Sequence, residues 1–237
     1  IKVAKACENQ GLISTIFDKV ISEPTIDNIM EGVSEMNVFK PDTIIAVGGG
    51  SVMDAAKVMR LFYEYPEQDI KKIATRFVDI RKRVAGCPVL GKLVKTVICI
   101  PTTSGSGAEI TPVAIIKNKN GRKYPLVDGQ FTPDVAIVDP EFTLTLPKKL
   151  TAWGGFDALS HALESYVSLM STDFTKPYSI RALKLIFESL PTAYANGKDI
   201  EARQNMHNAS TIAGMAYANA FLGICQSIAD QLGSVYN

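Results

Sequence analysis

The sequence has few of the features that mark a disulfide-stabilised, membrane-embedded or polyanion-binding protein. Its four cysteines are widely spaced and form no Cys-X-X-Cys motif, so we expect free thiols and a reducing, cytoplasmic setting. No apolar run approaches the roughly 18 residues that a membrane span needs, and no signal peptide is visible. With 25 basic and 24 acidic residues, the chain has no charge excess that favours nucleic acid.

Two common nucleotide-binding motifs are also absent, because neither GxGxxG nor GxxxxGK[ST] occurs in the chain. This absence argues against an ordinary Rossmann dehydrogenase and against a P-loop protein. Histidine is scarce: only His161 and His207 are present, so the chain offers at most two imidazole ligands to a metal. The one basic cluster, residues 76–83, alternates with apolar residues and indicates a solvated helix face.

At 237 residues and 46% hydrophobic content, the chain is long enough to bury a substantial core. The pattern of apolar residues changes after Pro147, where only helical periodicity remains. We therefore expect an α/β nucleotide-binding domain with a Rossmann-like parallel sheet over residues 1–148, with its first strand missing. An all-α domain, also incomplete, is expected over residues 149–237.

The stretch around which the chain is organised is a strand, a glycine turn and a helix start. Residues 43–47 are apolar and β-branched, as in a strand buried on both faces of a parallel sheet. The turn that follows consists of Gly48, Gly49 and Gly50. Ser51 is placed to cap the next helix, with Asp54 three residues later as the acid of a capping box. Such a turn either binds an anion, most plausibly a dinucleotide pyrophosphate, or only redirects the chain.

A second small, hydroxyl-rich turn follows another predicted strand, residues 95–100. It runs from Pro101 to Glu109 and has the composition of a loop that wraps a phosphate or a ribose, although a plain connecting loop has the same composition. In open α/β sheets, ligands bind outside the carboxyl ends of the strands. We therefore expect the two turns to meet.

The remaining elements follow from apolar spacing and turn residues. Strands are predicted at 13–21 and 135–138, and a hairpin at 113–116 and 122–127 around an Asn-Gly turn. Helices are predicted at 1–10, 26–39, 52–65, 69–84, 156–169, 180–190 and 202–232. The βαβα order over residues 13–65 favours a parallel sheet.

Asp157 and His161 are four residues apart, so on a helix they project from one face and could chelate one divalent ion. The alternative is an aspartate near a helix start that pairs with a histidine one turn later. A carboxylate and an imidazole suit a borderline ion such as Fe²⁺ or Zn²⁺. His207 has polar neighbours and is interpreted as a surface or helix-packing residue, while Lys123 is interpreted as a solvated hairpin lysine.

Three stretches together resemble the iron-containing (group III) alcohol dehydrogenases: residues 48–57, 101–109 and 157–164. Residues 76–83, 123–126 and 218–223 are similar to the C-terminal alcohol dehydrogenase half of bifunctional aldehyde–alcohol dehydrogenases. The resemblance implies NAD(H) along Gly48 to Ser51 with Asp54 nearby. It implies that the nicotinamide end is held by Thr102, Thr103, Ser104, Ser106, Thr111, Ile115 and Lys123.

The resemblance further implies that Asp157 and His161 are catalytic residues that bind Fe²⁺, with Zn²⁺ as the alternative. The implied reaction is the reversible, NADH-dependent reduction of acetaldehyde or another small aldehyde to a primary alcohol, as in ethanol fermentation. A homo-oligomer is expected, and a filament if the chain is part of a bifunctional enzyme.

The sequence departs from the family pattern at two positions. Gln226 stands where the family has its third, histidine ligand, and Asp230 replaces a further histidine beside the substrate. The fourth ligand is expected beyond Asn237, and both ends indicate a piece of a longer protein. The alternative function is therefore a catalytically impaired fragment or degenerate paralogue that retains nucleotide binding or a role in assembly.

Overall fold

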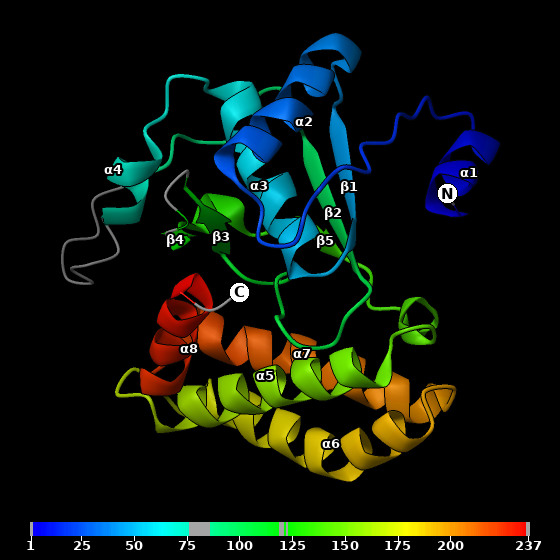
Figure 1. The fold of residues 1–237 in the computed structure, drawn as a ribbon, viewed down its shortest axis with the longest axis vertical. Coiled ribbons are helices and arrows are strands. Elements are labelled where there is room, and N and C mark those ends of the chain that lie inside the picture. Colours follow the sequence, from blue (N-terminus) through cyan, green and yellow to red (C-terminus); the bar gives the residue numbers. More distant parts are fainter. Residues whose placement is uncertain (1, 76–85, 119–120, 122, 236–237) are drawn as a thin grey trace.

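The computed structural model describes residues 2–75, 86–118, 121 and 123–235 (Figure 1). The first part contains both strands and helices: α1 (Lys2–Asn9), α2 (Ile26–Phe39), β1 (Thr43–Gly48), α3 (Gly50–Glu64), α4 (Ile70–Thr75), β2 (Thr96–Pro101), β3 (Val113–Lys117), β4 (Lys123–Val127) and β5 (Val135–Ala136). Two short 3₁₀ turns, η2 (Gly129–Phe131) and η3 (Pro140–Thr143), flank β5. The second part is helical: α5 (Lys148–Val167), α6 (Lys176–Ala195), α7 (Ile200–Ala220) and α8 (Ile224–Val235).

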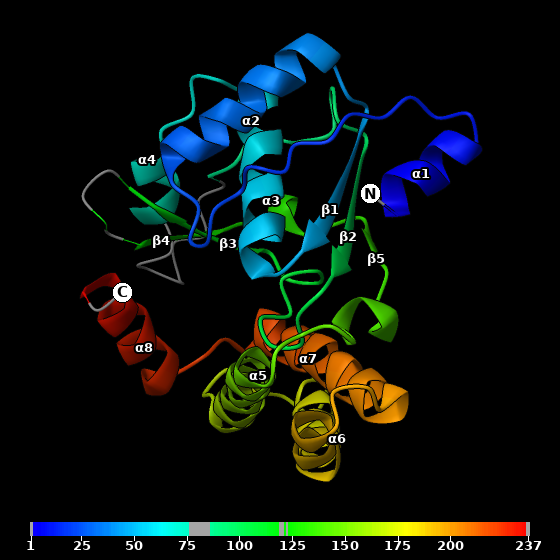
Figure 2. The same ribbon diagram turned by 45° about the vertical axis from the view of Figure 1, so that its right-hand side comes forward.

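A parallel sheet with the order β1-β2-β5 is the centre of the first part, as predicted. Thr43 of β1 pairs with Thr96 of β2, and the register continues to Gly48 and Pro101, so the two predicted turns leave the sheet at the same edge. Helices α2 and α3 pack together, and α3 also packs on the sheet. Figures 1 and 2 show α3 between the parallel sheet and the β3–β4 hairpin.

The strand predicted at residues 13–21 is wrong, because residues 12–21 have no regular secondary structure. Their apolar positions do not alternate with the strict period of two that a half-buried strand needs. Ile13 is 88% exposed, whereas Phe17 and Val20 pack against the core. Of the βαβα order, the structure therefore keeps α2, β1 and α3.

The predicted hairpin is confirmed: β3 and β4 pair in antiparallel register, with Ile115 opposite Pro125. Its turn closes through a hydrogen bond from the Gly121 amide to the Asn118 carbonyl (3.0 Å), and Gly121 has φ +76°, which suits glycine. Asn120 lies outside the described residues. The basic cluster at 76–83 and most of the helix predicted at 69–84 also lie outside them.

In the helical part, α5, α6 and α7 pack against one another, and α8 contacts both α5 and β4 (Figure 2). The single helix predicted at 202–232 is wrong, because the chain breaks at Phe221, which has φ +63°, and α7 and α8 meet at 105°. Among the described residues, no single helix is long and apolar enough to cross a membrane. Only α7 and α8 taken together, a pair bent by 105°, have the length and the composition of a membrane span. The four cysteines are free, as predicted, and Cys99 is buried.

Candidate functional site

The glycine turn at the end of β1 lies directly against the second predicted turn. The Thr102 amide donates a hydrogen bond to the Gly48 carbonyl (2.9 Å). A Cβ added to Gly49 would lie 3.3 Å from Thr103 Oγ1, and one added to Gly50 would lie 3.0 Å from Ser106 Oγ. The two turns therefore meet as predicted, and the missing side chains allow that approach.

The predicted capping box is wrong. Gly49 is the N-cap of α3, with no capping hydrogen bond from a side chain. The Ser51 hydroxyl instead accepts a hydrogen bond from the Glu23 amide (3.1 Å), and the Asp54 carboxylate accepts one from the Ile115 amide (3.0 Å). The hydrogen bond makes this carboxyl a partner of the hairpin, and burial raises the pKa of Asp54 to about 6.

The segment from the last residue of β2 to the start of β3, residues 101–112 and called the loop below, lies between α5 and α7 beneath the sheet (Figures 1 and 2). Three buried or half-buried hydrogen bonds attach it to α7. They join Ser104 Oγ to His207 Nδ1 (2.9 Å), the Thr211 hydroxyl to the Glu109 carboxylate (2.6 Å) and the Tyr217 hydroxyl to the Ser106 carbonyl (2.6 Å). The loop that lines the candidate cofactor site is thus also the contact between the two parts of the chain.

Glycines allow this loop to approach the helices closely. A Cβ on Gly105 would lie 2.8 Å from the Cα atom of Gly154 on α5. Gly107 has φ +65°, and a Cβ there would lie 2.9 Å from the Cα atom of Gly214 on α7. Close backbone contacts between the loop and the two helices therefore depend on glycines on both sides.

Asp157 and His161 lie on α5 and face each other, with His161 Nε2 3.4 Å from Asp157 Oδ1. The other ring nitrogen of His161, Nδ1, lies 3.2 Å from the Gly105 carbonyl. A carbonyl only accepts hydrogen bonds, so Nδ1 is the donor to Gly105 and Nε2 is the ring nitrogen that faces the carboxylate. A carboxylate oxygen and an imidazole nitrogen that face each other are a donor set for a divalent cation. The Tyr217 ring packs 4.6 Å from the imidazole, centroid to centroid.

These two donors fit part of the coordination sphere of a divalent ion. No group of three His, Cys, Asp or Glu residues that could hold a metal occurs in the part of the chain that the structure describes. Gln226 lies in the first turn of α8, whose start is held by the Glu164 carboxylate. That carboxylate accepts hydrogen bonds from the amides of Gly223 (3.0 Å), Cys225 (2.6 Å) and Gln226 (3.3 Å).

Lys123 is not the solvated lysine that the plain interpretation suggested, because its side chain is 16% exposed and lies 2.5 Å from the Glu23 carboxylate. Glu23 also pairs with Lys117 and has φ +55°, an uncommon backbone conformation for a residue other than glycine. Across from Lys123, burial raises the pKa of Asp230 on α8, an effect that Lys123 opposes and Asp157 reinforces. The hairpin and α8 therefore face each other beside the Asp157–His161 pair.

His207 is buried, with an exposed fraction of 1%, so a place on the surface is ruled out and the helix-packing alternative holds. The sequence did not predict its contact with the loop because Ser104, its partner, lies 103 positions away along the chain. Thr111 is also buried, and Thr111 and Ile115 lie where the loop runs into the hairpin. The structure thus gathers the predicted residues on two turns, one hairpin and α5.

Comparison with known proteins identifies the family. Residues 1–140 match the model of iron-containing alcohol dehydrogenase, and residues 151–237 match the C-terminal model of the Fe-containing alcohol dehydrogenase family. The chain belongs to the iron-containing alcohol dehydrogenases. This result confirms the resemblance noted in the sequence.

Individual relatives agree with this assignment. The aldehyde-alcohol dehydrogenase of Streptococcus pneumoniae is 52% identical over 227 residues, which are 95% of this chain and 26% of that protein. The chain thus spans about a quarter of the length of this curated relative.

Solved structures show the same fold. An iron-containing alcohol dehydrogenase from Thermococcus thioreducens superposes with a TM-score of 0.88 at 31% identity, covering 100% of this chain and 60% of that one. A sulfoacetaldehyde reductase from Bifidobacterium kashiwanohense, solved in complex with NAD⁺, gives a TM-score of 0.82 at 30% identity, covering 99% and 62%. The predicted fold class is therefore confirmed, incomplete relative to these full-length chains.

Proposed function

We propose that the protein is an NAD(H)- and metal-dependent alcohol dehydrogenase that interconverts a small aldehyde, acetaldehyde first of all, and the primary alcohol. The proposal rests mainly on the Asp157–His161 pair, whose imidazole contacts the Gly105 carbonyl. Gly105 belongs to the same loop that packs against the glycine turn. The reaction moves a hydride from NADH to the carbonyl carbon and a proton to the oxygen. We also propose the division into domains 1–148 and 149–237.

The cofactor's pyrophosphate is assigned to the turn formed by Gly48, Gly49, Gly50 and Ser51. The start of α3 supplies amide donors and the positive end of a helix dipole there. The nicotinamide end is assigned to the loop and the hairpin, at Thr102, Thr103, Ser104, Ser106, Thr111, Ile115 and Lys123. The NAD⁺ complex of the related sulfoacetaldehyde reductase supports this choice of cofactor.

Asp157 and His161 are the proposed metal-binding and catalytic residues. When bound, Fe²⁺ or Zn²⁺ supplies a Lewis acid that polarises the aldehyde oxygen. The chain's own contribution is orientation: the Gly105 carbonyl fixes the tautomer of His161, and the Tyr217 ring fixes its plane.

The second candidate is a catalytically impaired relative that retains nucleotide binding or a role in assembly. Gln226 and Asp230 favour it, because an amide is a weaker ligand for these ions than an imidazole. Metal analysis and NADH-dependent acetaldehyde reduction on the purified protein separate the two candidates. We expect bound metal and turnover, and a loss of both in Asp157→Ala, with at least about 100-fold lower activity.

The variant Gln226→His tests the same site from the other direction. We expect it to bind Zn²⁺ or Fe²⁺ at least about tenfold more tightly than the wild type, since imidazole replaces an amide. NADH binding without metal or turnover would leave only the second candidate. NADH binding that is indifferent to Asp157→Ala would instead indicate a nucleotide-binding module without redox chemistry.

We further propose a cytoplasmic homo-oligomer. Exposed apolar side chains in the helical part support the oligomer, among them Phe156, Phe174 and Phe187. Light scattering on the purified protein tests the oligomeric state, and electron microscopy tests for a filament in the protein that carries an aldehyde dehydrogenase half.

A further inference from the structure

Lys57 is a buried cation on α3, two turns after the glycine turn. Only 2% of the residue is exposed. Its ammonium group donates hydrogen bonds to the carbonyls of Thr111 (2.9 Å) and Val113 (2.8 Å) and lies 4.0 Å from the Asp54 carboxylate. A buried ammonium is costly unless its protons are satisfied, so these two carbonyls are specific partners.

Lys57 and Asp54 together replace a neighbouring strand along the outer edge of β3. Strand β3 pairs with β4 on one side, and at its end Lys117 also forms a single bridge to Thr25, where its amide donates to the Pro24 carbonyl (2.9 Å). On the other side the carbonyl of Val113 accepts from Lys57 and the amide of Ile115 donates to Asp54. Two side chains of α3, one turn apart, thus satisfy backbone groups that an edge strand would leave unpaired.

The same ammonium group is electrostatically coupled to the loop that contacts α7. The Glu109 carboxylate is buried and bonded to Thr211, and the charge of Lys57 opposes the rise in the pKa of Glu109 that burial causes. Asp54 and the buried Cys99 thiol are the other titratable groups that interact with Lys57. Lys57 therefore interacts electrostatically with carboxylates of α3 and of the loop.

We propose that Lys57 is a positioning residue for the cofactor, which fixes the hairpin and the end of the loop relative to the glycine turn. The argument is geometric: α3 begins at the proposed pyrophosphate site, and Lys57 holds the backbone at Thr111 and Val113, next to the proposed nicotinamide site. This inference rests on the proposed function, since it takes NAD(H) as the ligand.

The test compares Lys57→Met with Arg60→Met in the purified full chain. Arg60 is a matched control because it is a buried cation on the same helix that donates to a backbone carbonyl, that of Val94 (3.0 Å), away from both turns. We expect both variants to melt at lower temperature. Only Lys57→Met should weaken NADH binding, by roughly tenfold in Kd measured by fluorescence titration, because the two halves of the site lose their fixed spacing.

Hydrogen–deuterium exchange supplies a readout that does not need the cofactor. Amides of residues 113–117 should exchange at least about tenfold faster in Lys57→Met than in Arg60→Met. The milder variant Lys57→Gln, which keeps an uncharged hydrogen-bond donor, is measured in the same experiments. If Lys57→Met does not fold, Lys57→Gln is compared with Arg60→Met instead.

Equal NADH affinity and equal exchange in the Lys57 and Arg60 variants would overturn the proposal. A wild-type protein that does not bind NADH would instead refute the proposed function. In that case the exchange data still decide whether Lys57 holds the hairpin.

Discussion

His207 shows how far a single residue can differ from its sequence context. Its neighbours in the chain are polar, yet it is buried against Ser104, and burial lowers its pKa to about 4. The position of Asp157 and His161 on one helix face could be predicted because it depends only on helical spacing. The partner of His207 could not, since it lies 103 positions away along the chain.

Protonation of His207 should destabilise the fold at acidic pH. The unfolded chain takes up the proton near pH 6.5 and the native state only near pH 4, so stability is complete above 6.5 and falls as the pH drops toward 4. The loss attributable to this residue should approach about 3 kcal/mol. Urea unfolding of the wild type and of His207→Asn, at pH values from 4 to 7, measures it.

The variant should be less stable at pH 7 but should lose less stability on acidification. Asp54, whose pKa is raised to about 6, acts in the opposite sense between about pH 4 and 6, and the comparison with the variant cancels that effect. Parallel pH profiles for the two proteins would contradict the assignment.

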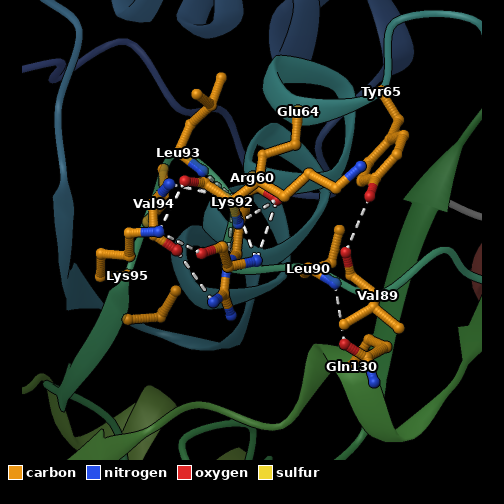
Figure 3. A network of polar contacts seen from close by, with 12 residues as sticks. Arg60, Glu64, Tyr65, Val89, Leu90, Lys92, Leu93, Val94, Lys95 and Gln130 are labelled. Atoms are coloured by element: carbon orange, nitrogen blue, oxygen red, sulfur yellow. Dashed lines mark hydrogen bonds and ion pairs between the residues drawn. The ribbon is translucent and has the colours of Figure 1, made fainter.

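At the scale of elements, the strand, glycine turn and helix could be predicted because local sequence determines them. The false strand at 13–21 and the missed break at Phe221 have another cause, since pairing partners and backbone conformation at a bend depend on distant contacts. Figure 3 shows such a contact, in which Glu64 near the end of α3 is surrounded by the loop that precedes β2.

Glu64 should be essential for the stability of this region. Its carboxylate is fully buried and accepts hydrogen bonds from the amides of Gly91 (2.9 Å), Lys92 (3.0 Å) and Val94 (3.0 Å), while Arg60 bonds the Val94 carbonyl. In Glu64→Gln an amide NH₂ group would face these donors. We expect a loss of about 2–4 kcal/mol in the free energy of unfolding, measured in urea.

Glu67→Gln is the matched control, because Glu67 is exposed on the segment just after α3. It should change the free energy of unfolding by no more than about 0.5 kcal/mol. Similar losses in both variants would show that the carboxylate of Glu64 is not what holds the loop.

At the scale of the whole molecule, the α/β part and the helical part meet at the loop of residues 101–112. The meeting of two turns at one sheet edge could be predicted from the parallel topology. The seating of the loop between α5 and α7 could not, because it depends on glycine pairs such as Gly107 and Gly214, whose contact no local pattern reveals.

A side chain added between the loop and α7 should destabilise the contact between the two parts of the chain. A Cβ at Gly214 would lie 2.8 Å from Ile110 Cγ2 and 3.1 Å from the Gly107 carbonyl. Gly214→Ala should therefore lower the free energy of unfolding by about 1–3 kcal/mol and weaken NADH binding. Gly129→Ala is the control, because a Cβ there meets nothing within 4 Å, and an equal effect of both changes would contradict the prediction.

The loop of residues 101–112 joins the two parts of the chain and is also the proposed nicotinamide site, which has a thermodynamic consequence. A dinucleotide that binds the native loop from the side of the glycine turn also stabilises the contacts of the loop with α5 and α7. Binding therefore stabilises both parts of the chain together. Saturating dinucleotide should then delay melting of the strands and of the distant helices by the same number of degrees, as one cooperative event.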